Sequence, residues 1–160
     1  MTLAGEEYNL NNNYLNINSD NRNDLNGKTI TGRYCPSTRL SDYLKINGGI
    51  TIDNVTVDLT IKDVTIQSGG DGARGWDLAG IYLKGNAQLN LTLEGDNTLL
   101  GLEHGAGIEV EKGATLVITE QSTGGPIGTS HCLQASGTIL RNNQCCLFFH
   151  LNSGSMLQPQ

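Results

Sequence analysis

The chain has 160 residues, a formal net charge of −6 and only 16% charged residues. Such a length is typical of one domain. Because Lys and Arg are few and scattered, the sequence offers no basic face for a nucleic acid or an anionic membrane surface, and neither is expected as a partner. A helical protein would need more Glu, Lys and Arg on its surface. The abundance of Gly, Asn, Thr and Ser instead favours short strands joined by tight turns.

Three kinds of segment are not expected in this sequence. No apolar run approaches the roughly 20 residues of a bilayer-spanning helix, so we expect no membrane insertion. The first seven residues contain neither a basic nor an apolar stretch, so we expect no signal peptide there. The cysteines fit no zinc-binding spacing and are too few for a disulfide framework, so we expect free thiols. They are Cys35, Cys132, Cys145 and Cys146.

Residues 1–42 are predicted to form an N-terminal capping segment. Leu15 and Ile17 alternate with asparagines, which indicates a strand with one polar face. Residues 29–31 are predicted to form another short strand, and residues 33–42 a loop. Asn side chains readily satisfy backbone groups. We therefore expect the Asn-rich stretch 8–18 to cap one end of the fold.

Residues 43–128 alternate between aliphatic and polar side chains over many short stretches. Leu89, Leu91 and Leu93 give the clearest example, and residues 95–97 are predicted to be the turn that follows. Residues 79–84 match residues 106–111, and residues 57–61 match residues 89–93. The two pairs are separated by different distances along the chain, which indicates repeats with insertions at their turns.

Repetition of this kind predicts an all-β fold, a β-solenoid. A single rung of short strands cannot bury its inward aliphatic side chains, whereas neighbouring rungs cover them and supply backbone hydrogen bonds. An antiparallel sandwich would also have short alternating strands, and it is the alternative. The ends of a solenoid carry open strand edges, so self-association through them is a further expectation.

Residues 129–160 form an atypical C-terminal segment, predicted to be irregular. After Glu120 the sequence has no Asp or Glu, and residues 145–149 are continuously apolar instead of alternating. This segment is interpreted either as a cap on the last rung or as a truncated end.

The repeated motifs occur in a recognisable order: Ile61–Ile66, Ala79–Leu83, Leu93–Leu99 and Gly105–Ile118. In this order they resemble the β-helix segments of bacterial secreted and cell-surface proteins, including those described as carbohydrate-binding-domain proteins. The resemblance covers about residues 43–128. It implies a right-handed parallel β-helix, an extracellular or cell-surface location, and adhesion or contact with a polysaccharide or cell-surface glycan. It carries over no catalytic residue.

Carboxylates are candidate catalytic groups, because polysaccharide hydrolysis needs an acid and a base on either side of the scissile bond. Asp53, Asp58 and Asp63 lie between inward aliphatic residues. We therefore expect them on solvated strand faces and at turns. No catalytic residue is predicted.

One Gly-rich segment, residues 69–78, is the predicted ligand site. Its start is similar to a calcium-binding repeat, although Arg74 stands where a second Asp is needed; if calcium binds, Asp71 and Asp77 are its ligands. The segment also holds the sole Trp of the chain, Trp76, which could stack on a sugar ring. The predicted ligand-binding residues are thus Trp76, Asp71, Arg74, Asp77 and the nearby Tyr82.

The sequence therefore favours a non-catalytic surface or secreted module that binds glycan or is adhesive. The first alternative is a polysaccharide-cleaving β-helix enzyme or its remnant. The second is a structural spacer or a part like those of tail fibres.

Overall fold

A computed structural model describes most of the first 119 residues and several shorter stretches beyond them. The described ranges are 6–35, 49–67, 79–100, 106–119, 121–123, 125–127, 133–135, 137–141 and 157–159. Within these ranges the chain forms strands and one short helix, α1 (Arg22–Leu25). The prediction of an all-β protein is confirmed.

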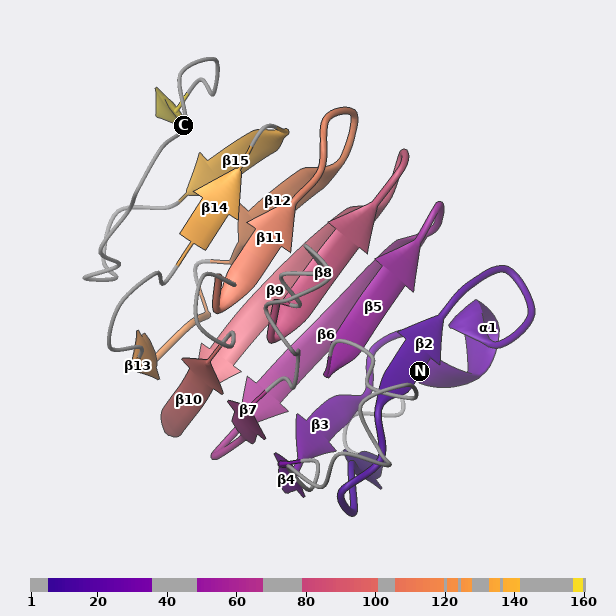
Figure 1. Ribbon diagram of the computed structural model, residues 1–160, viewed down its shortest axis with the longest axis vertical. Helices are drawn as coiled ribbons and strands as arrows, with labels where there is room; N and C mark the ends of the chain where they lie inside the picture. Colours follow the sequence, from indigo (N-terminus) through magenta and orange to yellow (C-terminus); the bar gives the residue numbers. More distant parts are fainter. Residues whose placement is uncertain are drawn as a thin grey trace, which may run out of the picture.

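The described strands form three sheets (Figure 1). The largest has seven strands and contains, in order, β1 (Glu7–Asn9), β3 (Thr29–Thr31), β6 (Thr56–Lys62), β9 (Gln88–Glu94), β12 (Thr115–Ile118), β15 (Thr138–Arg141) and β16 (Leu157–Pro159). The five-stranded sheet contains β2 (Leu15–Ile17), β5 (Ile50–Asp53), β8 (Ile81–Lys84), β11 (Ile108–Val110) and β14 (Leu133–Ala135). The four-stranded sheet contains β4 (Arg33–Tyr34), β7 (Thr65–Gln67), β10 (Asp96–Leu100) and β13 (Gly125–Ile127).

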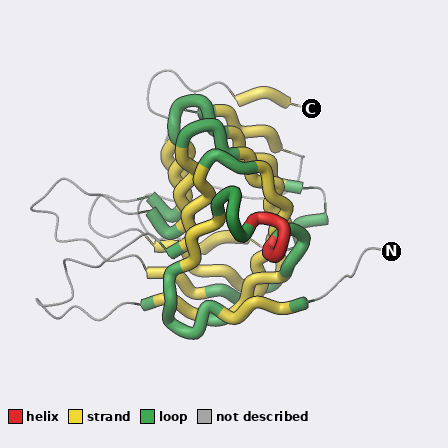
Figure 2. The backbone as a smooth tube through the Cα atoms, turned by 90° about the vertical axis from the view of Figure 1, so that its right-hand side faces the viewer, coloured by secondary structure: helices red, strands yellow, loops and turns green. Residues whose placement is uncertain are grey.

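The chain visits the three sheets in a fixed order. From β2 to β15 it passes from the five-stranded sheet to the seven-stranded sheet and then to the four-stranded sheet, and repeats this cycle. We call one such set of three strands a rung; Figure 2 shows the successive rungs stacked along one axis. Every described strand pair is parallel. The antiparallel sandwich is therefore wrong for the described residues.

The internal sequence matches coincide with the register of the strand pairs. Ile81 on β8 lies opposite Ile108 on β11. In the seven-stranded sheet, Val57 on β6 lies opposite Leu89 on β9. Because equivalent residues stack directly above one another, the same side-chain pattern recurs on each rung and the aliphatic columns stay in line.

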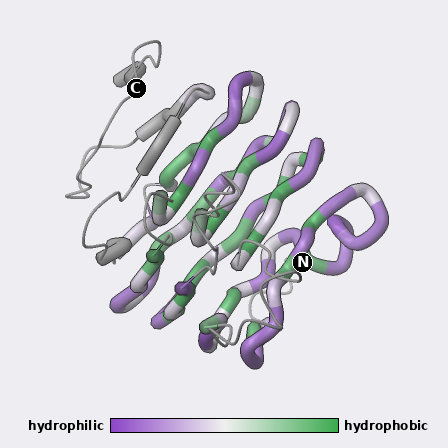
Figure 3. The backbone as a smooth tube through the Cα atoms, viewed as in Figure 1, coloured by the Kyte–Doolittle hydropathy of each residue, from purple (hydrophilic) through white to green (hydrophobic). Residues whose placement is uncertain are grey.

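The inward side chains of all three sheets form one apolar interior. Leu89, Leu91 and Leu93 are fully buried, while the residues between them are partly exposed. Figure 3 shows hydrophobic and hydrophilic positions alternating along the strands. Each buried aliphatic side chain contributes roughly 1.5–3 kcal/mol by leaving water. The interior extends to Leu10 and Leu25 near the N-terminal end.

Glycine is required at two kinds of corner. A Cβ on Gly80 would lie 2.7 Å from the carbonyl oxygen of Gly107 on the next rung, so no side chain fits there. Gly95, between β9 and β10, has a φ of 63°, a left-handed conformation that costs glycine little. The predicted turn at residues 95–97 is shorter than expected, because Asp96 and Asn97 already belong to β10.

The N-terminal region is more regular than the sequence indicated. Strands β2 and β3 lie where they were predicted, but the predicted loop 33–42 begins with β4, and α1 was not expected. Both missed elements are very short, and each is held by residues distant in sequence. Strand β4 pairs with β7, and α1 is bonded through Arg22 to Thr56 of β6. Strands of the same sheets also lie outside residues 43–128, with β1 to β4 before them and β14, β15 and β16 after them. The described residues of the C-terminal segment therefore form paired strands, and the prediction of an irregular segment is wrong for them.

Candidate functional site

The lengths of the connections between strands vary most at one corner of the rungs. The chain passes from β5 to β6 through Asn54 and Val55, and from β6 to β7 through Asp63 and Val64. By contrast, the connections from the four-stranded to the five-stranded sheet span residues 35–49, 68–80 and 101–107. The longer connections of three successive rungs thus join the same two sheets, whereas the next one is short, residues 128–132. One other long connection, residues 18–28 between β2 and β3, contains α1.

The predicted ligand segment belongs to this set of insertions. It joins β7 to β8, and four of the five predicted ligand-binding residues lie in it. Asp71, Arg74, Trp76 and Asp77 fall outside the described residues, so the sugar and calcium interpretations of this segment stay predictions. The fifth residue, Tyr82, is the second residue of β8, just beyond the insertion.

Tyr82 lies on the outer face of the five-stranded sheet. In register it stands between Thr51 on β5 and Glu109 on β11. Two residues further along each strand, the same face carries Asp53 and Lys84, which form an ion pair with Nζ and Oδ2 3.6 Å apart. This pair is largely solvent-exposed and adds little stability. With Glu109 and Glu111 also beside Tyr82, the face is polar and mainly acidic.

The hydroxyl of Tyr82 is held by the next rung. It donates a hydrogen bond to Glu111 Oε1 over 3.0 Å, and Glu111 Oε2 accepts a hydrogen bond of 2.5 Å from the backbone N–H of Gly85. Burial, the hydrogen bond to Glu111 and the charges of nearby carboxylates raise the pKa of Tyr82 to about 12. Tyr82 therefore stays protonated at neutral pH and links its own rung to the next one. Its proton is thus committed to Glu111, and its ring and the lone pairs of its hydroxyl oxygen remain for contact with a ligand.

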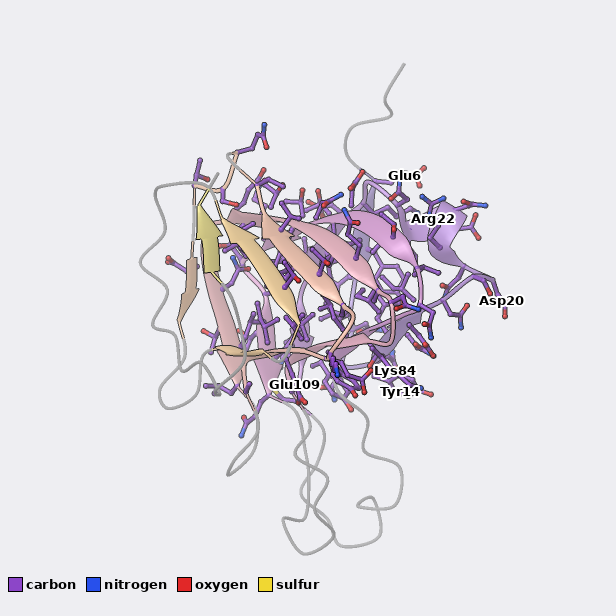
Figure 4. The ribbon with its side chains drawn as sticks, turned by 90° about the horizontal axis from the view of Figure 1, so that it is seen from above. Glu6, Tyr14, Asp20, Arg22, Lys84 and Glu109 are labelled. Carbon is purple, nitrogen blue, oxygen red and sulfur yellow. The ribbon has the colours of Figure 1, made fainter. Side chains whose placement is uncertain are left out.

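A second aromatic side chain on this side of the molecule was missed in the sequence. Tyr14, directly before β2, has 50% of its surface exposed. Figure 4 shows Tyr14, Lys84 and Glu109 on the side of the molecule opposite Glu6 and Arg22. The available signal was the alternation of Tyr14 and Asn16 with the inward Leu15, which predicts that both point outward.

The three aspartates considered as catalytic groups do not converge. Asp53 ends β5 in the five-stranded sheet, whereas Asp58 points outward from β6 in the seven-stranded sheet. Asp63 occupies a corner with a φ of 50°, where its Oδ1 accepts a hydrogen bond of 3.0 Å from the backbone N–H of Asp96. Their predicted places on outward faces and at turns are confirmed.

The described ranges contain neither a metal-binding cluster nor a membrane-spanning helix. Within them, no three His, Cys, Asp or Glu side chains are grouped so that they could hold a metal ion. No helix in those ranges combines the length and the apolar character needed to cross a membrane.

No protein-family model, curated protein or solved structure matches this chain. The candidate site is therefore defined by its own geometry, as the outer face of the five-stranded sheet around Tyr82 and the insertions that border it.

Proposed function

We propose that this chain is a right-handed parallel β-helix module of a secreted or cell-surface protein, and that it binds glycan without cleaving it. The fixed order of the three parallel sheets and the continuous aliphatic interior support the β-helix. The location and the glycan rest on the resemblance to bacterial surface proteins and on the composition of the site.

One observation carries the proposed function: the long connections of three successive rungs all run from the four-stranded to the five-stranded sheet. In repeat proteins, insertions on one face commonly build the binding surface, while the stacked repeats act as a rigid support. Here the corner between these two sheets borders the outer face that carries Tyr82, Asp53 and Glu109.

The chemistry of the insertion between β7 and β8 suits a sugar. The indole ring of Trp76 can stack on the apolar face of a pyranose, and the charged groups of Asp71, Arg74 and Asp77 can form hydrogen bonds with its hydroxyls. The ring of Tyr82 and the exposed Tyr14 add aromatic surface on the side of the molecule that carries Lys84 and Glu109. Cleavage is not proposed, since the described carboxylates considered for it lie apart.

Replacing Trp76 by Ala tests the proposal on a glycan array. We expect retention to fall about tenfold or more, the loss typical of an aromatic hot spot, while far-ultraviolet circular dichroism stays unchanged. Thr60→Ala on the outer face of the seven-stranded sheet is the matched control, and it should bind like the wild type.

Three other results would reject this function. Full binding by the Trp76→Ala variant would remove the stacking site. Release of reducing ends from a pectin panel by the wild type would favour the polysaccharide-cleaving enzyme. If the wild type binds no glycan at all, the structural spacer is the better description.

A further inference from the structure

The outermost strand of the five-stranded sheet, β2, has one edge that faces away from β5. Along a parallel strand, successive residues direct their backbone N–H and C=O groups alternately to the two sides. Leu15 donates its N–H to the carbonyl oxygen of Gly49, on the chain leading into β5, over 2.8 Å. Asn16 and Asn18 therefore direct their backbone groups to the open edge, where another strand could be added.

The side chain of Asn21 occupies this edge. Its Nδ2 donates a hydrogen bond to the carbonyl oxygen of Asn16 over 2.8 Å, and its Oδ1 accepts one from the N–H of Asn18 over 3.0 Å. A carboxamide thus offers the same donor and acceptor that one residue of an added parallel strand would offer. The C=O of Asn16 and the N–H of Asn18, two of the groups that a new strand would need, are therefore already bonded.

The local structure indicates that the main role of Asn21 is to bond the open edge of β2. It is the N-cap residue of α1, a position where an Asn side chain usually accepts a hydrogen bond from the first turn of the helix. Here it makes no such bond and turns to β2 instead. The helix is itself fixed to the stack, since Arg22 Nε donates to the carbonyl oxygen of Thr56 over 2.7 Å. Figure 1 shows α1 beside β2 at this end of the stack.

The four-stranded sheet ends in a similar way, but with a backbone N–H as the donor. The outward groups of β4 are the carbonyl oxygen of Arg33 and the N–H of Cys35. Asn12 satisfies both: its N–H donates to Arg33 over 2.8 Å, and its Oδ1 accepts from Cys35 over 2.7 Å. Asn12 has a φ of 62°, a conformation that Asn tolerates better than most residues. Two different sheets thus end in an asparagine bonded to a C=O and to the N–H two residues later.

We propose that Asn12 and Asn21 close these two edges against strand addition, so that the N-terminal end of the stack does not accept a strand from a second copy of the chain. The third edge, β1, carries the exposed charge of Glu7, which also opposes pairing. The inference concerns self-association and is independent of the proposed glycan binding.

The test is the double variant Asn12→Ala with Asn21→Ala, studied by amide hydrogen exchange and sedimentation velocity at low and high protein concentration. In dilute solution, the N–H groups of Asn18 and Cys35 should exchange about tenfold or more faster than in the wild type. At high concentration they should regain protection while the protein sediments as a dimer or larger species. The control is Asn23→Ala, which removes an exposed Asn of α1 that bonds only Arg22 among the described residues, and it should behave like the wild type.

Exchange at these two amides makes the test specific for this end, because association through any other surface would leave them unchanged. Fast exchange at both concentrations would mean that the two asparagines merely satisfy backbone groups, and would overturn the proposal. Wild-type protection in the double variant would overturn it as well. Should the double variant not fold, Asn21→Ala alone gives the same comparison at Asn18.

Discussion

The paired strands and the insertions at one corner differ in how closely their lengths are constrained. Strands β6 and β9 stay in register from Thr56 opposite Gln88 to Lys62 opposite Glu94. The connections between the four-stranded and five-stranded sheets, in contrast, span residues 35–49, 68–80 and 101–107. Within a strand, a shift of one residue would expose every inward side chain. In a connection, doubling the length costs only about 0.6 kcal/mol in closure entropy, so that corner is free to change for function.

Among substitutions of polar side chains inside the stack, Asn97→Ala should lower the free energy of unfolding most. Asn97 is completely buried; its Oδ1 accepts a 3.0 Å hydrogen bond from the N–H of Val64, and its Nδ2 donates one of 2.9 Å to the carbonyl oxygen of Glu94. Removing the amide leaves these backbone groups unpaired, so the free energy of unfolding in urea should fall by about 1–3 kcal/mol.

Asn90→Ala is the comparison for that loss. Asn90 lies on the outer side of β9, where its Nδ2 donates to Asp58 Oδ1 over 2.6 Å and solvent can replace the bond. Its substitution should change the free energy of unfolding by no more than about 0.5 kcal/mol. Equal losses for the two variants would mean that buried and outward positions do not differ as described.

A smaller effect is expected from Tyr82→Phe, and it should depend on pH. Loss of the hydrogen bond to Glu111 should lower the free energy of unfolding by about 1 kcal/mol at neutral pH, a modest value because the side chain is only partly buried. The pKa of Tyr82 is about 12 in the folded protein, against an ordinary value of 10.0. Its contribution is therefore complete below pH 10 and is lost as the pH rises towards 12.

Urea unfolding of both proteins between pH 8 and about pH 12 measures this contribution. The stabilities of the wild type and the Phe variant should converge above pH 10. A constant difference across that interval would contradict the link between Tyr82 and the next rung.

The sequence predicted those features that depend on a local repeat. Alternation placed Leu89, Leu91 and Leu93 inside, and the internal matches anticipated the register of their strands. It could not predict that the side chain of Asn97 is buried, because an Asn after Gly95 is typical of an exposed turn. That burial depends on a backbone N–H in the previous rung, distant in sequence.

For the candidate site, too, the sequence predicted individual residues but not their partners. Tyr82 was singled out as the residue next to a Trp-containing insertion, and Asp53, Asp58 and Asp63 were correctly expected outside the core. The partner of Tyr82 was not foreseen. Glu111 is brought to it only by the stacking of β8 on β11, with a register that no local pattern contains.

The most direct test of the account exchanges one insertion for another, with little expected effect on the fold. Residues 68–78 would be replaced by the five residues of segment 101–105, Gly-Leu-Glu-His-Gly, which already connect the same two sheets on the next rung. If the stack carries the fold and the insertion carries binding, the melting temperature should stay within about 3 °C of the wild type while glycan retention is lost. Retained binding, or a chain that no longer folds, would contradict this division between support and site.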